Sequence, residues 1–289
     1  MNILSVQSHV TYGYVGNSAA VFALQRLGHQ VWPIHTVAFS NHTGYEGWSG
    51  QVFTADHVRD LVDGLEARGL LRHCDAVLTG YLGSLELAHA ILDAVDKVRT
   101  ANPDAVFACD PVMGDRDGGL YVRAGLPEFF AERAIAAANI ISPNHFELEQ
   151  LAGEQIVSRS QAISAASRIL SAPASQSLKA VVITSLAHED VQSGEIEMLA
   201  VSREGTWQLT TPFLAMDPMP SGAGDLVSAL FLAHSLSGND PATALAQTGS
   251  SVFAVLSETQ KTGSRELELV RAQDKLASPD RRFKAIQIT

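Results

Sequence analysis

Apolar residues along the chain gather in short continuous runs, and the stretches between these runs have apolar positions at helical spacing. The runs are rich in β-branched residues and read NILSVQ, VWPIHTVAF, DAVLTGY, AVFACD, NIISPN and KAVVITSL. Continuous apolar runs, unlike alternating ones, are typical of parallel strands that are covered on both faces. The intervening periodicity predicts helices over residues 17–27, 54–68, 84–99, 126–138 and 160–172.

This alternation of strands and helices predicts βαβ units, and the pattern changes after the sixth run. Residues 195–202 and 206–214 are expected to form an antiparallel hairpin at one edge of the sheet, followed by helices that begin at Gly222, Pro241 and Ser264. The chain contains no linker, low-complexity tract or internal repeat. We therefore expect residues 1–289 to form a single α/β domain, with a mostly parallel central sheet and helices on both faces.

Composition and charge exclude several classes of protein. A chain of 289 residues with 46% hydrophobic content can bury a large core, but no stretch approaches the length of a membrane span. A strand-like run stands where a signal peptide would begin, so we expect a cytoplasmic location. The net charge of −11 argues against nucleic-acid binding. Cys74 and Cys109 form no CxxC motif, so we expect core residues instead of a disulfide or a zinc site.

Polar residues and glycines follow the predicted strands at the points where they end. Because ligands of parallel α/β sheets bind at the carboxyl ends of the strands, this distribution predicts a ligand site there. Any single residue of the set could also be a cap or a turn residue. The set consists of Ser8, Thr43, Gly80, Tyr81, Asp110, Asn144 and Glu147.

A glycine-rich stretch, MPSGAGDLVSALFLAHSL, precedes and begins an apolar helix near residue 222. Gly222 and Gly224 allow the backbone to approach a ligand, and the unpaired amides of a helix start attract anions such as phosphate. Asp225 would repel an anion unless it serves as a proton acceptor, and at a helix N-terminus we expect it to be a weak base. A plain loop with Ser221 as N-cap is the alternative. A valine at Gly222 is expected to obstruct a phosphate.

The motifs of several large enzyme classes are absent from the sequence. The sequence lacks GxxxxGK[ST], which argues against a P-loop NTPase, and it lacks a GxGxxG after the first strand, which argues against a dinucleotide-binding fold. It also lacks GxSxG and HExxH, which argues against serine hydrolases and zinc proteases. Of the ten histidines, His9, His42 and His145 lie near the predicted site.

Six segments together resemble pyridoxal kinases of the ribokinase superfamily, specifically the bacterial pyridoxamine/pyridoxal kinase branch. They are QSHVTYGYVGNSAA, SNHTGYEGW, GYLGS, DPVMGD, NHFELE and SGAGD, and they span essentially the whole chain. SGAGD is common to the superfamily, whereas the QSHV opening and the FSNHT loop are more specific. The resemblance implies a three-layer ribokinase-like fold, a homodimer, and transfer of the γ-phosphoryl group of ATP to the 5′ hydroxymethyl of pyridoxal, pyridoxine or pyridoxamine.

The resemblance also implies roles for individual residues around the acceptor hydroxyl. Asp225 would accept the proton of this hydroxyl, while the N–H groups of Gly222, Ala223 and Gly224 hold the migrating phosphoryl group. The vitamin would be bound by Ser8, by Thr43 with Gly44 in a covering loop, and by the rings of Tyr81 and Phe39, although Tyr81 and Phe39 could instead be core residues.

On the nucleotide side, Asp110, Asn144 and Glu147 would place Mg²⁺ and phosphate. Because Mg²⁺ usually keeps several waters, Asp110 and Glu147 are expected to hold it partly through water. Residues 112–122 resemble the flap that closes over the phosphates. Residues expected to line the ATP site are Ser142, Thr184 and Thr211.

The chain departs from the family pattern at three positions. Thr184 stands where relatives often have a lysine and Thr211 where they often have an arginine, while Leu120 replaces a flap cysteine of some members. The loss of two cations is consistent with weak ATP binding, or with compensation by a flap cation such as Arg116. A hydroxymethylpyrimidine kinase and a poorly catalytic pyridoxal carrier are the alternatives, and vitamer preference and a monovalent-cation requirement stay open.

Overall fold

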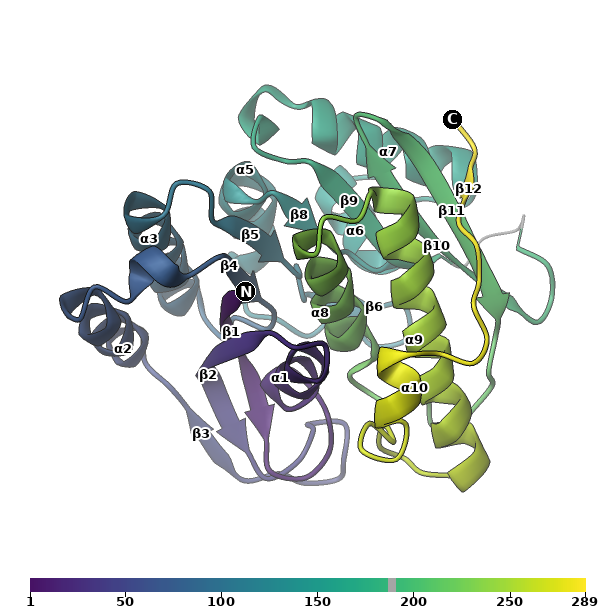
Figure 1. The fold of residues 1–289 in the computed structure, drawn as a ribbon, viewed down its shortest axis with the longest axis horizontal. Helices are drawn as coiled ribbons and strands as arrows, with labels where there is room; N and C mark the ends of the chain where they lie inside the picture. The colour runs from purple at the N-terminus through teal and green to yellow at the C-terminus, as the bar shows by residue number, and fades with distance from the viewer. Residues whose placement is uncertain (187–190) are drawn as a thin grey trace.

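A ten-stranded sheet runs through the whole molecule in the computed structural model, which describes residues 1–186 and 191–289 (Figure 1). The strand order is β12-β11-β10-β9-β8-β5-β4-β1-β2-β3. The six central strands are parallel and comprise β1 (Asn2–Val10), β2 (Gln30–Phe39), β4 (Ala76–Thr79), β5 (Val106–Cys109), β8 (Ile140–Ile141) and β9 (Ala180–Leu186).

Antiparallel strands complete both edges of the sheet. β10 (Glu195–Ser202), β11 (Gly205–Pro212) and β12 (Ile286–Gln287) extend it beyond β9, and β3 (Gly50–Val52) pairs with β2 at the other edge. A separate two-stranded hairpin consists of β6 (Gly114–Asp115) and β7 (Gly119–Leu120). The predicted edge hairpin is confirmed, whereas β3, β12 and the β6–β7 hairpin are additions that the sequence pattern did not predict.

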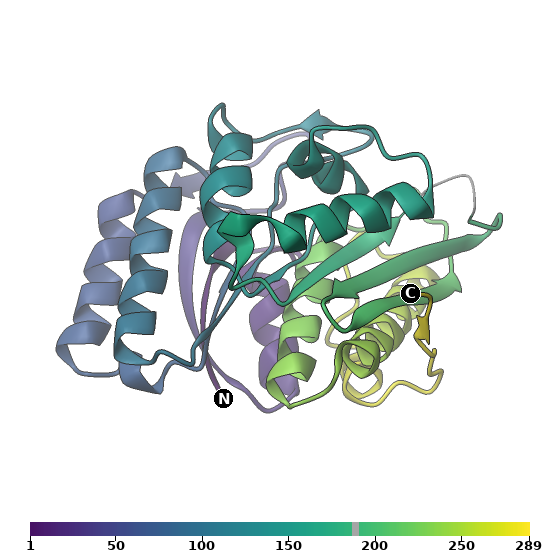
Figure 2. The same ribbon diagram turned by 90° about the horizontal axis from the view of Figure 1, so that it is seen from above.

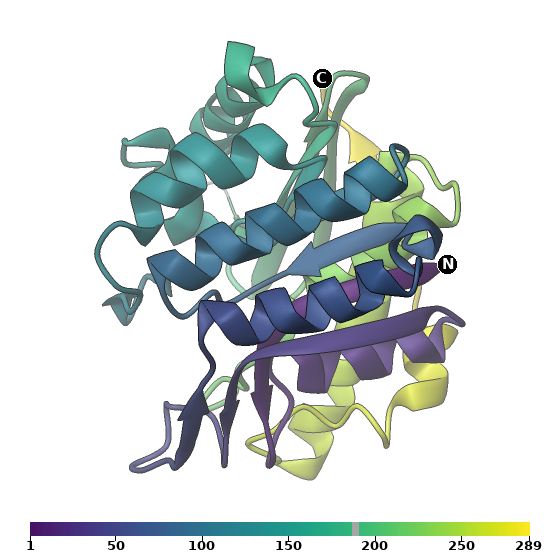
Figure 3. The same ribbon diagram turned by 90° about the vertical axis from the view of Figure 1, so that its left-hand side faces the viewer.

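Helices cover both faces of the sheet, so the predicted three-layer arrangement is confirmed (Figures 2 and 3). None of the helices in the two described ranges is long and apolar enough to cross a membrane. One face carries α1 (Asn17–Arg26), α8 (Ala223–Leu236), α9 (Pro241–Thr262) and α10 (Gln273–Ala277). The other carries α2 (Ala55–Ala67), α3 (Leu85–Ala101), α4 (Leu126–Phe129), α5 (Ile135–Ala137), α6 (His145–Ala152) and α7 (Arg159–Ser171).

Residues of a single central strand contribute to both cores. In β1, Ile3 packs in the core beneath α1 and α8, whereas Leu4 and Val6 pack in the core beneath α2 and α3. Helix α8 is buried on all sides, since every residue from 226 to 233 is at most 5% exposed. A helix that is apolar all round belongs in the interior. The N-terminus of α8 is therefore held in place by the packing of the whole helix.

Two predicted helices differ from the structure in detail. The helix expected over 126–138 forms as one helical run, but residues Phe130–Ala134 are π-helical. The helix expected from Ser264 is wrong, because the chain forms turns there and α10 begins only at Gln273. Ser264 Oγ bonds both the carbonyl and the amide of Glu266, which satisfies these backbone groups without a helix.

The short helix α6 was not predicted, although its start has a clear signal. Asn144 Oδ1 accepts a hydrogen bond from the Glu147 amide, and Glu147 Oε2 accepts one from the Asn144 amide, at 2.9 and 2.8 Å. This reciprocal pair is a capping box. The Asn-x-x-Glu spacing could have revealed the helix.

A β-bulge lies where β1 reaches the carboxyl edge of the sheet. The pairing of β1 with β2 shifts between Gln7 and His9, and the buried side chain of Asn17 fills the irregularity. Its amide nitrogen lies 2.9 Å from the Ile34 carbonyl and 3.1 Å from His35 Nδ1, while its oxygen accepts from Ser5 Oγ at 2.7 Å. Asn17 therefore joins α1, β1 and β2 at the point where Ser8 is presented.

Replacing Asn17 with alanine should lower the free energy of unfolding by about 1–3 kcal/mol, because buried hydrogen-bonding groups of Ser5 and Ile34 lose their partner. Urea denaturation followed by circular dichroism measures the change. Asn239→Ala is a suitable control, since Asn239 likewise bonds through its side chain, to one carbonyl and one side chain, but lies at a partly exposed helix end. Its effect should stay within about 0.5 kcal/mol, and an equal loss in both variants would contradict the assignment.

Candidate active site

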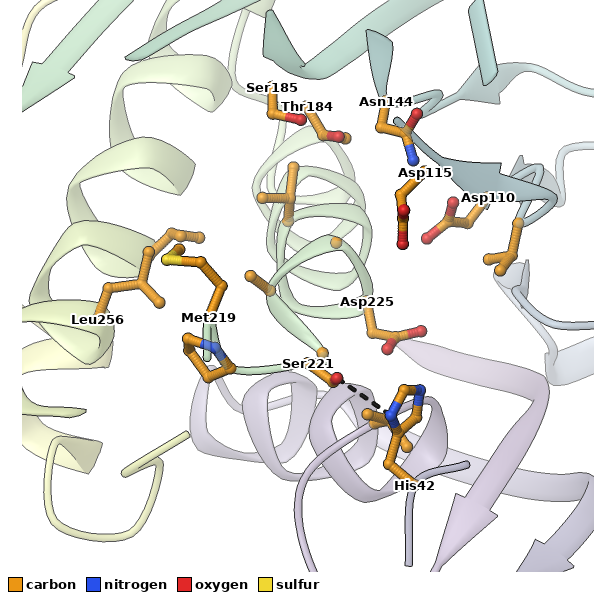
Figure 4. Close-up of a pocket in the computed structure, with 18 of the residues that line it drawn as sticks. His42, Asp110, Asp115, Asn144, Thr184, Ser185, Met219, Ser221, Asp225 and Leu256 are labelled. Carbon is orange, nitrogen blue, oxygen red and sulfur yellow. Dashed lines mark hydrogen bonds between the residues drawn. The ribbon is translucent and has the colours of Figure 1, made fainter. Parts of the chain in front are cut away.

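A cavity of about 970 Å³ lies at the carboxyl ends of the parallel strands, beside the start of α8 (Figure 4). The residues to which the family resemblance gave binding or catalytic roles line it. These are Ser8, Phe39, Thr43, Gly44, Tyr81, Asp110, Ser142, Asn144, Glu147, Thr184, Thr211, Gly222, Ala223, Gly224 and Asp225. Gly80 and Arg116 do not line it. The fold thus brings together residues from both ends of the chain, as their positions after the strands predicted.

The bulge in β1 presents Ser8 to the cavity and leaves no room behind it. A Cβ atom on Gly16, the N-cap of α1, would lie 2.3 Å from both the carbonyl oxygen and the hydroxyl of Ser8, and Gly16 has a φ of +53°. Only glycine fits this position. The Val-Gly-Asn part of the N-terminal motif therefore has a structural purpose, because Gly16 makes space for Ser8 and Asn17 fastens the bulge.

His42 connects the loop after β2 with the segment before α8, and it was not among the proposed site residues. Its Nδ1 atom accepts a hydrogen bond from the Gly44 amide at 3.2 Å, so the Ser221 hydroxyl, also 3.2 Å away, is the donor in the second contact. Burial lowers the pKa of His42, which favours the neutral ring that these contacts require. Ser221 is thus engaged with His42 and is not the N-cap of α8.

The start of α8 depends on the glycine at its N-cap. Gly222 has a φ of +93°, and a Cβ there would lie 1.8 Å from the Tyr14 carbonyl oxygen. A Cβ on Gly224, in contrast, would meet nothing within 4 Å. The first backbone bond inside the helix runs from the Leu226 amide to the Gly222 carbonyl. The preceding amides, those of Ala223, Gly224 and Asp225, have no carbonyl within the helix and are available to a ligand.

Buried carboxylates occupy the middle of the cavity. Burial raises the pKa of Asp110 well above its usual value, and the neighbouring charges of Glu147 and Asp225 raise it further. Burial likewise raises the pKa of Glu147 to about 7, against hydrogen bonds from backbone amides. These carboxylates repel one another and have lost the hydration that stabilises a charge in water. The site therefore has a strong affinity for positive charge.

Asp225 is a stronger base than its position at a helix N-terminus suggested. Burial raises its pKa to about 6, although a hydrogen bond from the Gly16 amide acts in the opposite direction. The expectation of a weak base is therefore wrong, because the loss of hydration outweighs the helix dipole.

A chain of hydroxyl groups supports Asp110 from behind. Ser228 Oγ donates to Asp110 Oδ2 at 2.8 Å, which leaves Ser142 as the donor in the 2.7 Å contact between the two serine hydroxyls. Ser142 lines the cavity, but its hydroxyl hydrogen is used in this chain. In the structure Ser142 thus acts on the site through Asp110.

Glu147 and Asn144 join α6 to the β6–β7 hairpin. Besides their capping box, Glu147 Oε1 accepts from the Met113 amide at 2.9 Å and Asn144 Nδ2 donates to the Gly114 carbonyl at 2.8 Å. Among the described residues, no group of three or more His, Cys, Asp or Glu side chains is arranged to hold a metal ion. A cation bound to Asp110 or Glu147 would therefore take its other ligands from water or phosphate.

The charge of the cavity lining is one-sided. It includes the carboxylates of Asp110, Asp115, Glu147 and Asp225, but no lysine or arginine among the residues that the structure describes. Thr184 and Thr211, at the two positions where the resemblance implied a lysine and an arginine, line the cavity, and Arg116 is not part of the lining. Attraction for an anion must come from backbone amides and from bound cations.

The far end of the cavity is apolar and was missed by sequence reasoning. Hydrophobic residues of β11, of the segment after it and of α9 form this end, and isolated apolar residues in such elements carry no specific signal. They include Phe213, Leu214, Met219, Val252, Phe253 and Leu256. Asp115 and Ser185, which also line the cavity, were likewise not proposed.

Comparison with known proteins places these features in a family. Residues 57–269 match the family model described as phosphomethylpyrimidine kinase. A pyridoxal kinase PdxY of Rubrobacter xylanophilus is 50% identical over 284 residues, which cover 98% of this chain and 96% of the relative. A pyridoxal kinase PdxY of Corynebacterium diphtheriae is 45% identical over 291 residues and all of both chains.

Solved structures lead to the same group. The pyridoxal kinase of Leishmania donovani, in complex with ADP and pyridoxamine, matches with a TM-score of 0.90 and 30% identity over 100% of this chain and 99% of that one. A putative phosphomethylpyrimidine kinase of Bacteroides thetaiotaomicron has a TM-score of 0.88 at 23% identity, over 99% and 97% of the two chains, and shares the fold. The chain therefore belongs to the pyridoxal kinase family.

Proposed function

We propose that this protein transfers the γ-phosphoryl group of ATP to the 5′ hydroxymethyl group of pyridoxal and thereby produces pyridoxal 5′-phosphate. The observation that carries this proposal is the position of Asp225. It lies between His42 on the ring-binding side and Thr184 with Ser185 on the other side, next to the free amides of α8 (Figure 4). An acceptor alcohol and a phosphate that enter from opposite ends would meet there.

The reaction requires a base for the alcohol and fixed dipoles for the moving phosphoryl charge. With a pKa of about 6, Asp225 is ionised at neutral pH and accepts a proton more readily than an ordinary aspartate. The amides of Ala223 and Gly224 would hold the equatorial phosphoryl oxygens, and such prearranged donors supply most of the stabilisation in phosphoryl transfer. Gly222 makes this possible by placing the turn.

A magnesium ion suits the carboxylate cluster, because a cation relieves the mutual repulsion of Asp110 and Glu147. Asp110 would hold it, and Glu147 would do so through water, since its two oxygens already accept from Asn144 and Met113. When bound, the ion neutralises phosphate charge that the lining cannot neutralise by itself.

The two ends of the cavity would bind the two substrates. We assign the pyridine ring to Ser8, to Thr43 with Gly44, and to the rings of Phe39 and Tyr81, and the base of ATP to the apolar end near Phe253. Thr184 and Thr211 lie on the nucleotide side, and the β6–β7 hairpin corresponds to the proposed flap. We further propose that residues 1–289 act as one domain and that the protein is a cytoplasmic homodimer, by resemblance to the family.

Two other functions are each favoured by one observation. The family model favours a hydroxymethylpyrimidine kinase, and the lack of lysine and arginine in the described lining favours a pyridoxal carrier with poor catalysis. Steady-state assays with ATP, Mg²⁺ and either pyridoxal or hydroxymethylpyrimidine should give the higher kcat/KM for pyridoxal. Preference for hydroxymethylpyrimidine would support the first alternative, and tight pyridoxal binding without turnover would support the second.

Asp225→Asn should lower kcat by about 10²–10⁴-fold, the usual contribution of a general base, while both substrates still bind. Because the base acts when deprotonated, kcat/KM of the wild type should fall as the pH drops through about 6. The part of this acidic limb that arises from Asp225 should be absent from the residual activity of the variant, whereas Glu147, with a pKa of about 7, still titrates. Asp217→Asn is the control, since Asp217 is exposed and lies outside the cavity lining. A decrease of less than about tenfold in Asp225→Asn would exclude the proton-acceptor role.

Valine substitutions at Gly222 and Gly224 should have different effects although the two positions are neighbours. At Gly222 the side chain would collide with the Tyr14 carbonyl at a positive φ, so the melting temperature should fall together with activity. Gly222→Val is expected from the sequence to obstruct a phosphate, and the collision with Tyr14 adds a loss of stability. At Gly224 the side chain would enter open space, so activity should fall with an unchanged melting temperature. Calorimetry and initial rates check both, and full activity of Gly224→Val would exclude a phosphate beside that amide.

A further inference from the structure

The loop after β2, residues 40–49, covers the ring-binding end of the cavity, and we name it the ring loop. The two ends of the loop are joined by a hydrogen bond from the Ser40 amide to the Ser49 carbonyl at 2.7 Å. Within the loop, Asn41 Nδ2 donates to the Gly47 carbonyl at 2.8 Å. Outside this frame most of the loop is exposed. Its position over the cavity therefore depends on a small number of contacts with the rest of the protein.

Two of these contacts come from Arg265, which is far away in the sequence. Its guanidinium carbon lies 3.7 Å from the centre of the Tyr45 ring, and its Nη2 donates to the Gly44 carbonyl at 2.9 Å. A guanidinium over an aromatic face is attracted by the ring electrons, and its planar fork can bond a neighbouring carbonyl at the same time. Arg265 thus holds the loop next to Thr43 and Gly44, which line the cavity.

Glu266 provides the second attachment, and it is itself fixed. The Tyr45 hydroxyl donates to Glu266 Oε1 at 2.5 Å, and the Tyr14 amide donates to Oε2 at 3.2 Å. Glu266 is 9% exposed, and Gly13 packs so closely that a Cβ there would lie 2.2 Å from Oε2. Burial and the Glu266 carboxylate raise the pKa of Tyr45 to about 12, which keeps its hydroxyl a donor.

The same segment adjoins the phosphate-binding turn. A Cβ on Gly222 would lie 1.8 Å from the Tyr14 carbonyl oxygen and 3.4 Å from Leu267 Cδ1. Tyr14, which bonds Glu266, and Leu267, which follows it in the chain, therefore both pack against the turn. The ring loop contacts this turn directly as well, through His42 and Ser221. Residues 264–267 therefore link the cover of the ring site to the start of α8.

We propose that residues 264–266 form a latch for the ring loop, and that Arg265 and Glu266 are positioning residues that set the affinity for the vitamin substrate. The proposal rests on the proposed function for the identity of that substrate. Neither side chain lines the cavity, so both act through Tyr45, Gly44 and Thr43. Loss of the latch should weaken binding of the ring and leave phosphoryl transfer from bound substrates intact.

Arg265→Ala removes the ring stack and the bond to Gly44, which should raise the KM for pyridoxal about five- to tenfold. kcat and the KM for ATP should change by less than about twofold, because the contacts of Asp225 and α8 are untouched. Arg265→Lys should recover only part of the affinity, since an ammonium cannot stack and bond as a planar fork does. Arg271→Ala is the matched control, because Arg271 lies in the same connection between α9 and α10. Among the contacts described for it, Arg271 pairs only with Glu268, at 3.7 Å.

A second measurement does not depend on catalysis. Glu46 is an exposed residue of the ring loop and offers a cleavage site to a glutamate-specific protease. Cleavage after Glu46, identified by mass spectrometry, should be faster in Arg265→Ala and in Tyr45→Phe than in the wild type and Arg271→Ala. Pyridoxal should slow it in the wild type.

The outcomes separate the latch from the proposed function. Unchanged cleavage after Glu46 in Arg265→Ala, with an unchanged KM for pyridoxal, would overturn the latch even if the protein phosphorylates pyridoxal normally. Faster cleavage in the variants of a protein that does not act on pyridoxal would support the latch and contradict only the assigned substrate. A fall of kcat with constant KM would place Arg265 in the chemical step and would also overturn the proposal.

Discussion

The close packing of the Tyr14 carbonyl against Gly222 is the contact on which the site depends. It leaves no space for a side chain at Gly222 and fixes the left-handed turn that begins α8. Because α8 is buried along residues 226–233, the turn cannot adjust by moving the helix. The amides that follow therefore stand at a fixed place in the cavity. Prearranged donors of this kind need no reorganisation when charge develops on a phosphoryl group.

Negative charge in the cavity is the second constraint, and it has two consequences. Burial raises the pKa of Asp110, Glu147 and Asp225, and neighbouring negative charge raises the pKa of Asp110 and Glu147 further. Asp225 gains basicity from its burial. The cost is repulsion toward an incoming nucleotide, which no lysine or arginine of the described lining offsets. The burial that improves the base thus also concentrates uncompensated negative charge, which makes the site dependent on bound cations.

Sequence reasoning predicted the layers, the parallel core, the edge hairpin and the residues that meet in the cavity. These features follow from local signals: continuous apolar runs, helical periodicity, and polar residues placed directly after strands. Because the carboxyl ends of parallel strands share one edge, residues as far apart as Ser8 and Glu147 could be assigned to one site, and the family resemblance added Asp225 to it. The failures were also local, since Ser264 forms side-chain bonds to the backbone instead of a helix, and a capping box at Asn144 passed unnoticed.

The sequence by itself therefore determined many of the polar residues that reach the site, because strand ends and short motifs are encoded in neighbouring positions, but it did not determine the apolar end. Only the tertiary structure decided how the surroundings change the basicity, the backbone conformation and the position of these residues. The basicity of Asp225 arises from burial by distant segments, the need for glycine at position 222 arises from the Tyr14 carbonyl, and the support of Tyr45 comes from Arg265 and Glu266. Such effects depend on distances between residues that the chain order does not specify, so they appear only when the chain is folded.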